Sequence, residues 1–324
     1  MERGKPFRFP MTLVCLLTWL AVIGIAGTPA LAASKLSIVY SGKVISQSPV
    51  WIAIEQGFFE KRGLTVRLTY IGGAPPVVAT LLAGGADVAL IGGVGIIRAY
   101  LGGAKNLVFI GALKNVLTGS IVGKPEFRTL TDLKGKKIGV ARIGSNPHFL
   151  AVEMLKRFHM DPGRDVSFIQ TGGQLESVAA MTSGAVDAIA VIPPQDTQVI
   201  QKGFRLIADG TALRIPYIAT AQATTRDTIA KRHDVLQGFV DAIREATQFL
   251  YTNRETAMGI IAKNTQIRDL KILELAYNAE VPVLERDFRI DLQGIAAVLN
   301  EAKSDFPQAA AGKPEDMVDT RFLK

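Results

Sequence analysis

The chain has 324 residues, of which 48% are hydrophobic and 20% charged, and its formal net charge is +8. This composition excludes a disordered, collagen-like or coiled-coil protein, and the length indicates about two globular domains. Aromatic residues make up only 7% of the chain and the basic residues form no long stripe, so we predict no nucleic-acid partner. The positive balance slightly favours small anionic ligands.

The start of the chain has the pattern of a secretory signal peptide. An apolar run over residues 11–27 follows a basic start, and Ala30-Leu31-Ala32 then supplies the small residues that a signal peptidase accepts. The alternative is an uncleaved membrane anchor, but the apolar run is at the short end for a bilayer span. We therefore predict a cleavable signal peptide over residues 1–32 and a mature chain in the periplasm.

The single cysteine, Cys15, lies inside that apolar run. A chain without residues 1–32 has no thiol. Disulfides, cysteine nucleophiles and iron–sulfur clusters are therefore excluded from the mature protein.

From Lys35 onward, short β-rich runs alternate with amphipathic stretches, and nearly every run ends in glycine or proline. This alternation predicts an α/β fold, and after residue 208 helical patterns dominate. The small and polar stretch 308–312 predicts a mobile tail. The predicted strands are 36–40, 65–71, 88–91, 107–112, 137–142, 166–171, 188–192, 205–208 and 217–223, and the predicted helices include 50–61, 149–158, 226–252, 255–263, 268–279 and 292–304.

An internal repeat has an offset of one hundred residues. When residues 50–93 are laid over 150–193 without a gap, nine positions are identical, against about three expected from average residue usage. The same offset places Ile138 on Ile38. The repeat predicts two similar α/β units, and a single long doubly wound domain is the alternative.

Each unit of the repeat contains a glycine pair before a helix, then a glycine and an aspartate before a strand. The glycine pairs, which include Gly72 and Gly73, allow a tight turn and a close backbone approach. Gly84 and Gly184 match helix ends. For the two aspartates, Asp87 and Asp187, a turn or cap hydrogen bond is favoured over ligand contact.

Motifs for catalysis are missing. None of the three histidines has a partner at metal-ligand spacing, and neither a G-x-S-x-G elbow nor a phosphate-binding P-loop occurs. Gly93-Val94-Gly95 opens a helix after a strand, but Arg98 replaces the last glycine of a dinucleotide-binding fingerprint. We predict no enzyme activity, no metal and no cofactor.

Six loops follow strand ends and precede helices, three in each unit. In open α/β sheets, ligands bind at the carboxyl ends of the strands, so we predict a cleft between the two units. The loops are 41–49, 72–75, 92–95, 142–148, 172–174 and 193–195.

The most specific of these loops contains Ser145-Asn146-Pro147, which can place N–H groups and a hydroxyl at the positive end of a helix. A plain helix cap explains it equally well. Lys43 and Arg142 follow the first strand of each unit, where a cation could meet a carboxylate or sulfonate, although an ordinary surface lysine is the alternative for Lys43. Trp51 either stacks on a ligand or fills the core.

Four segments carry a resemblance to a known family. With them, the sequence resembles the periplasmic substrate-binding proteins of ABC importers, in the NitT/TauT group with an SsuA/THI5-like (NMT1-like) domain, over essentially the whole mature chain. The segments are 48–64 (SPVWIAIEQGFFEKRGL), 82–90 (LAGGADVAL), 130–140 (LTDLKGKKIGV) with Gly144-Ser145, and 183–188 (SGAVDA).

The resemblance implies a type II periplasmic binding protein fold, in which two α/β lobes are joined by a two-strand hinge and C-terminal helices lie on the first lobe. Lobe I would comprise residues 33–120 and 221–324, and lobe II residues 121–220. A monomer of this kind captures a small-molecule solute and delivers it to ABC permease and ATPase subunits. The positions expected to bind the ligand are Ser46, Gln47, Gly73, Gly93, Val94, Ser145, Asn146 and Pro193, beside Lys43, Trp51 and Arg142.

The expected ligand is a small organic anion, either a sulfonate or a carboxylate and either aliphatic or aromatic, because helix N-termini and two cations surround the predicted cleft. The Pro-Pro pairs at 75–76 and 193–194 depart from the best-known sulfonate and taurine binders, which leaves its identity open. Two alternatives remain. One is a periplasmic sensor without transport, and the less favoured one is a THI5-like pyrimidine synthase, which depends on a cysteine-rich motif.

Overall fold

The computed structural model describes residues 1, 2, 4, 33–303 and 305–323. Met1–Ala33 and Ser34–Lys324 are separate units, and the fold described below is that of the second. The predicted signal peptide falls almost wholly outside the described residues, so its cleavage stays a prediction. Among the described residues, no helix combines the length and apolar character that crossing a membrane requires.

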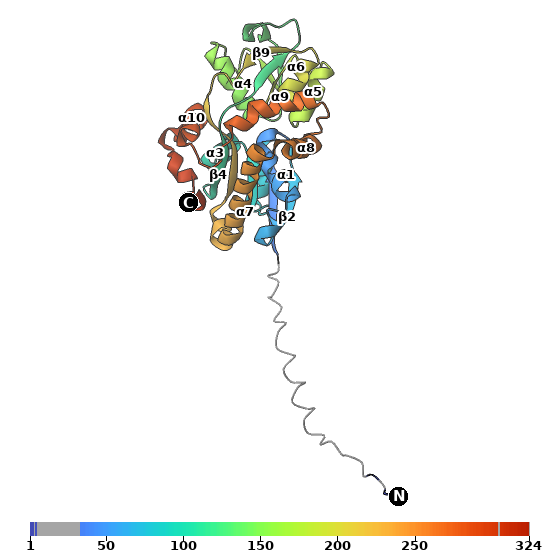
Figure 1. The fold of residues 1–324 in the computed structure, drawn as a ribbon. Coiled ribbons are helices and arrows are strands. Elements are labelled where there is room, and N and C mark those ends of the chain that lie inside the picture. Colours follow the sequence, from blue (N-terminus) through green and yellow to red (C-terminus); the bar gives the residue numbers. More distant parts are fainter. Residues whose placement is uncertain (3, 5–32, 304, 324) are drawn as a thin grey trace. The chain divides into compact units, whose positions relative to one another are not determined.

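The described residues form two five-stranded sheets, and each sheet is the centre of one lobe (Figure 1). The strand order is β2-β1-β3-β10-β4 in lobe I and β7-β6-β8-β5-β9 in lobe II. In each sheet the first three strands in the order pair in parallel, and the fourth strand runs antiparallel to both neighbours, so that the other four strands share one direction. The two-lobed α/β fold predicted from the sequence is confirmed. The bounds are β1 Ser34–Tyr40, β2 Leu64–Tyr70, β3 Val88–Ile91, β4 Leu107–Val116, β5 Ser120–Gly123, β6 Lys137–Val140, β7 Ser167–Gln170, β8 Ala188–Val191, β9 Arg205–Asp209 and β10 Pro216–Thr225.

The chain crosses between the lobes twice. It leaves lobe I between β4 and β5 and returns between β9 and β10, which gives the two-strand hinge. Strand β5 lies where we expected only a crossing, and it was missed because four residues are too few to show a period. The predicted lobe limits at residues 120 and 220 stay a prediction.

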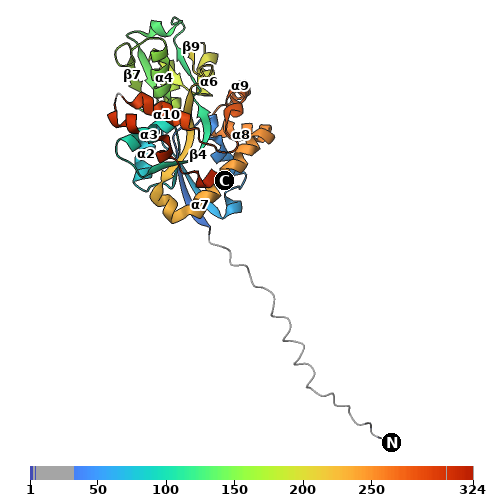
Figure 2. The ribbon, with the colours of Figure 1, turned by 90° about the vertical axis from the view of Figure 1, so that its left-hand side faces the viewer.

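The helices α1 to α6 each follow a strand, as the alternation predicts, and the last four helices follow β10. Figure 1 shows α4, α5 and α6 around the second sheet and α1 and α7 around the first, and Figure 2 shows α2, α3 and α10 on the other side of lobe I. The bounds are α1 Ser48–Glu55, α2 Ala74–Leu82, α3 Gly93–Leu101, α4 Asn146–Arg157, α5 Gln174–Thr182, α6 Gln195–Gln201, α7 Arg226–Thr252, α8 Arg254–Thr265, α9 Leu270–Glu280 and α10 Leu292–Ala302.

The internal repeat is visible in the hydrogen bonds of the two lobes. Asp87 Oδ2 accepts from the Ser37 N–H at 2.8 Å, and Asp187 Oδ2 accepts from the Lys137 N–H at 3.0 Å. These contacts are one hundred residues apart along the chain. The strand registers repeat in the same way, since β1 pairs with β3 as β6 pairs with β8. Two copies of one α/β unit therefore build the two lobes.

The glycines of the repeat end helices, as predicted. Gly84 and Gly184 follow the last residues of α2 and α5 with φ of 72° and 76°. A residue with a Cβ is disfavoured in this left-handed conformation, whereas glycine adopts it freely.

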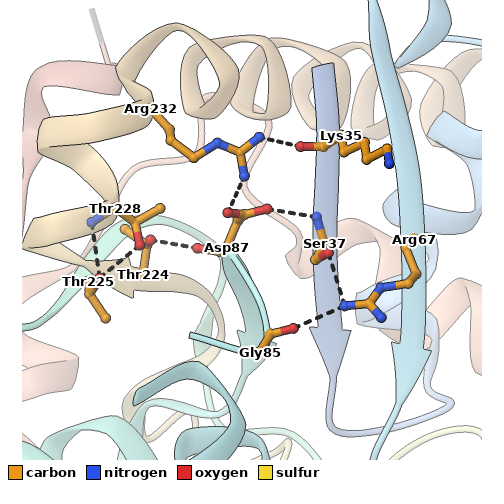
Figure 3. Close-up of polar contacts among 9 residues, drawn as sticks. All are labelled: Lys35, Ser37, Arg67, Gly85, Asp87, Thr224, Thr225, Thr228 and Arg232. Atoms are coloured by element: carbon orange, nitrogen blue, oxygen red, sulfur yellow. Dashed lines mark hydrogen bonds and ion pairs between the residues drawn. The ribbon is translucent and has the colours of Figure 1, made fainter. Parts of the chain in front are cut away.

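Asp87 ties four elements of lobe I together at the edge where the parallel strands begin (Figure 3). Its carboxylate pairs with Arg232 and accepts from the main chain of β1, while its carbonyl oxygen accepts from Thr224 Oγ1 of β10 at 2.6 Å. Arg232 also donates to the Lys35 carbonyl, and its non-helical φ and ψ of −140° and 34° kink α7 at this point. Asp87 is therefore a structural residue, in agreement with the favoured interpretation.

The predicted mobile tail at 308–312 is wrong. Residues Pro307–Ala311 form a 3₁₀ helix in which Ala309 is buried, and Gln308 Nε2 donates to the Leu101 carbonyl at 2.9 Å. The small residues permit close packing on lobe I, so their composition reflects a tight contact.

Asp87→Asn should destabilise the protein by about 1–3 kcal/mol, because it removes the charge from hydrogen bonds to a partly buried carboxylate. The measurement is the free energy of unfolding in urea. Asp234→Asn is the matched control, since Asp234 lies on the same helix α7 and is exposed. Equal losses in the two variants would contradict the structural role of Asp87.

Candidate functional site

A cavity of about 40 Å³ lies between the lobes, at the edges of the sheets where the parallel strands end. Five of the six predicted loops contribute residues to its lining, and next to the sixth loop, 193–195, only the preceding Ile192 does. Strand β10 contributes two more, which sequence reasoning missed because a buried strand carries no sign of facing a cavity. The lining residues are Ser41, Gly42, Val44, Gln47, Gly73, Ala74, Gly92, Ala141, Ser145, Asn146, Pro147, Gln174, Ile192, Ala219 and Thr220.

Four of the eleven residues predicted to bind a ligand line this cavity. They are Gln47 and Gly73 from lobe I and Ser145 and Asn146 from lobe II. Gln47 is held in place by its own lobe, because Nε2 donates to Ser41 Oγ at 3.2 Å and Oε1 accepts from the Gly42 N–H at 3.3 Å.

Three predicted residues of the first loop and helix are not among the residues that line the cavity. Ser46 is fully buried and accepts from Thr220 Oγ1 at 2.8 Å. Trp51 is only 2% exposed and packs edge-on against Tyr40, so it fills the core of lobe I. The Lys43 ammonium lies over the Tyr70 ring, 5.3 Å from its centre.

Gly93 and Val94 open helix α3 and are closed off by β10. A Cβ on Gly93 would lie 1.9 Å from the Ile218 side chain, so only glycine allows this approach. The Val94 N–H donates to the Tyr217 hydroxyl at 3.4 Å.

Arg142 and Pro193 lie in lobe II next to the cavity. The Arg142 side chain crosses to lobe I, where Nε donates to the Gly72 carbonyl at 3.1 Å. Its aliphatic part covers Gly73, because a Cβ there would meet it at 2.7 Å. Pro193 precedes α6 and is joined to Pro194 by a cis peptide bond.

The lining carries no charged side chain among the described residues. Three helices, α2, α4 and α5, begin with a lining residue, and the first turn of a helix has free N–H groups and a partial positive charge. An anion in this cavity would therefore be held mainly by neutral donors and helix ends, with the nearest predicted cations just outside. No group of three His, Cys, Asp or Glu residues in the described part of the chain is placed to hold a metal.

The two lobes contact each other at glycine residues, which have no side chain. A Cβ on Gly92 would lie 1.6 Å from Asn146 Oδ1, and a Cβ on Gly72 would lie 2.5 Å from the Gly172 carbonyl oxygen. The two glycine turns of the repeat thus meet across the cleft. The close backbone approach predicted from the glycine pairs is a contact between lobes.

Asp196 is a buried acid in the first turn of α6. Its carboxylate accepts from Ser120 Oγ at 3.2 Å and from the Thr197 N–H at 2.6 Å. Burial raises the pKa of Asp196 to about 6, and the Glu280 carboxylate contributes in the same direction. Glu280 itself pairs with Lys114 at 2.7 Å in a buried contact.

Comparisons with known proteins agree with this architecture. A family model described as "NMT1/THI5 like" matches residues 45–257. YtlA of Bacillus subtilis, described as a putative binding protein, is 26% identical over 223 residues, which are 67% of this chain and 66% of the relative. The chain therefore spans just under two thirds of the length of that relative.

Two solved structures share the fold. The alkanesulfonate-binding protein SsuA of Xanthomonas axonopodis pv. citri, bound to MOPS, has a TM-score of 0.75 at 20% identity and covers 89% of this chain and 98% of its own. The periplasmic aliphatic sulphonate-binding protein SsuA of Escherichia coli has a TM-score of 0.71 at 20% identity, with 89% and 92% covered.

Gly92→Ala should displace the Asn146 amide and so weaken the contact that holds the lobes together, because the new Cβ would occupy the position of the amide. The backbone of Gly92, with φ of −74° and ψ of 139°, suits alanine, so the effect is steric contact alone. Small-angle X-ray scattering should show a larger radius of gyration. Gly102→Ala is the control, since its nearest contact would be an ordinary 3.4 Å. Identical scattering from both variants would refute the contact.

Asp196→Asn should stabilise the protein at neutral pH. A folded-state pKa of about 6 against an ordinary value of 3.8 means that the folded protein binds an extra proton between these values, so ionisation costs stability as pH rises through this window. The cost reaches about 2–3 kcal/mol above pH 6. Urea unfolding should show equal stability of the two proteins near pH 4 and a growing advantage of the variant up to pH 7. A difference that does not change with pH would rule this out.

Proposed function

Because the chain belongs to the NMT1/THI5-like family, we propose that it is the solute-binding component of an ABC importer. It captures a small organic anion between its lobes and delivers it to a membrane permease and its ATPase. The observation that carries the proposal is the uncharged cavity between two lobes, lined from both and bordered by helix N-termini. A periplasmic location follows if the predicted signal peptide is cleaved.

The size and polarity of the cavity favour a sulfonate or carboxylate head group. About 40 Å³ is room for roughly three water molecules, and therefore for a head group of a few heavy atoms. Three helix starts at the cavity supply donors suited to such oxygens. The neighbour bound to MOPS, a sulfonate, supports the same chemistry. A larger ligand would need a wider opening of the lobes.

A binding role is favoured over an enzymatic one. The relatives are described as binding proteins, and a pyrimidine synthase would need cysteine chemistry, whereas Cys15 lies in the predicted signal peptide. Closure alone performs the proposed function, because a solute that touches both lobes binds the closed state better and shifts the hinge equilibrium toward it.

All eleven predicted ligand positions stay proposals. Four of these positions line the cavity, which supports their assignment: Gln47, Gly73, Ser145 and Asn146. Gln174 also lines the cavity and is a further candidate.

The first test is a thermal-shift screen of the purified protein in Tris buffer against MOPS, alkanesulfonates, aromatic and aliphatic carboxylates, nitrate and neutral pyrimidines. A ligand at 100 times its Kd should add about 2.7 kcal/mol to stability and raise Tm. Stabilisation by anions would support the proposal. Stabilisation by neutral pyrimidines alone would contradict the anion assignment.

Ser145→Ala combined with Asn146→Ala should weaken the binding of a screened anion by about tenfold or more, because hydrogen bonds at the cavity are lost. Isothermal titration calorimetry gives the affinity. Ser183→Ala is the control, since its hydroxyl bonds only to the Ala180 carbonyl at the far end of α5. Unchanged affinity in the double variant would place the ligand elsewhere.

A further inference from the structure

Three side chains of lobe II donate hydrogen bonds to main-chain carbonyl oxygens of lobe I around the cavity. Arg142 reaches Gly72 at 3.1 Å, Asn146 reaches Ala219 at 2.5 Å, and Gln195 reaches Lys43 at 3.3 Å. The acceptors lie on separate segments, namely the loop after β1, the turn after β2, and β10. The lobes are thus joined at three points beside the space proposed for the ligand.

Among the three donors, Asn146 is the one whose side chain both donates to and accepts from lobe I. Its Nδ2 donates to Ala219, and its Oδ1 accepts from the Tyr217 hydroxyl at 2.8 Å. The amide occupies the space that the absent side chain of Gly92 leaves open. Both ends of the amide are therefore satisfied by lobe I.

Tyr217 has little freedom to point elsewhere. It is fully buried, its ring stacks on Phe149 at 4.6 Å, and its hydroxyl also accepts from the Val94 N–H. The loop that carries Asn146 is fixed in the same way from its own lobe, because Ser145 Oγ donates to the Arg142 carbonyl at 2.6 Å. The bond from Val94 and the bond from Ser145 each hold one partner from within its own lobe, which reduces the entropy lost on forming the contact. The stacking of Tyr217 on Phe149 of α4 is a further contact between the lobes.

From this geometry we propose that Asn146 is a closure latch. It strengthens ligand binding by holding the lobes together, and its amide does not bond to the ligand. The inference rests on the proposed function and changes the role expected for Asn146. The affinity of a protein that binds in one of two states is reduced by the fraction in the competent state, so a residue that stabilises closure raises the affinity for every ligand by one factor.

The test measures the distance between the lobes directly. Spin labels are placed on Ala83→Cys and Ser183→Cys, which are exposed and equivalent in the two units of the repeat. The full chain carries Cys15→Ser, so that these are its only thiols. Pulsed electron spin resonance then gives the populations of short and long distances in the absence of any added anion.

Asn146→Ala should lower the closed-to-open ratio by about threefold to tenfold, as the loss of an interlobe hydrogen bond predicts. Tyr217→Phe keeps the stacked ring and should act in the same direction. The double variant should be no more open than Asn146→Ala alone, because both changes remove one interaction. Gln170→Ala is the control, since Gln170 accepts from the Ile143 N–H in the same loop but within lobe II.

An unchanged distance distribution in Asn146→Ala overturns the latch. Fully additive effects of the two substitutions overturn the link through Tyr217. A merely structural role would lower Tm without shifting the distances, which also overturns the latch.

The affinities for MOPS and benzoate give a second test, which is independent of the distance measurements. A latch lowers both affinities by the same factor in Asn146→Ala, whereas unequal factors mean that the amide touches the ligand and overturn the proposal. If neither compound binds the unmodified protein, the proposed anion function fails while the distance measurements still decide the latch.

Discussion

The closed cleft depends on the contact between Gly92 of lobe I and the Asn146 amide of lobe II. The amide of Asn146 lies where the glycine lacks a side chain, so helix α4 of lobe II can approach the start of α3 in lobe I. This approach brings β10 within reach, aligns the ends of the strands and leaves a cavity of only about 40 Å³. A Cβ at position 92 would displace the amide and remove its two hydrogen bonds to β10.

The lobes are joined differently at the hinge and at the cavity. Around the crossings, one apolar cluster continues from lobe I into lobe II through Leu117, Ile121 and Ile215. Breaking such packing is costly, because interiors are dense and voids are not tolerated. At the cavity the joining contacts are hydrogen bonds, which water can replace at a modest net cost. Opening should therefore begin at the cavity and pivot about the packed crossings.

The alternation of strands and helices could be predicted because buried strands have continuous apolar runs that end in glycine. Helix α1 ends six residues earlier than predicted, since Gly57 adopts φ of 68° while the apolar pattern continues through Phe58 and Phe59. The six loops around the cavity were also predictable, because parallel strands end at one edge. The partners of Asn146 were not, since Tyr217 is 71 residues away and only the folded chain brings them together.

The divergence of the two repeat units explains why lobe II supplies the donors of the three side-chain contacts to main-chain carbonyls of lobe I. At equivalent positions, lobe I has small residues where lobe II has long ones: Gly42 against Arg142, Ser46 against Asn146, and Gly95 against Gln195. A symmetric pair of long side chains would collide in a cleft this narrow, and a symmetric pair of small ones would leave the lobes unconnected. The small side chains of lobe I leave main-chain carbonyls accessible as acceptors. The long side chains of lobe II supply the donors that reach them. Neither predicted cation lines the cavity, because the Arg142 side chain donates to the Gly72 carbonyl and the Lys43 ammonium lies over the Tyr70 ring. The two copies of the repeat therefore differ at three positions where they meet across the cleft.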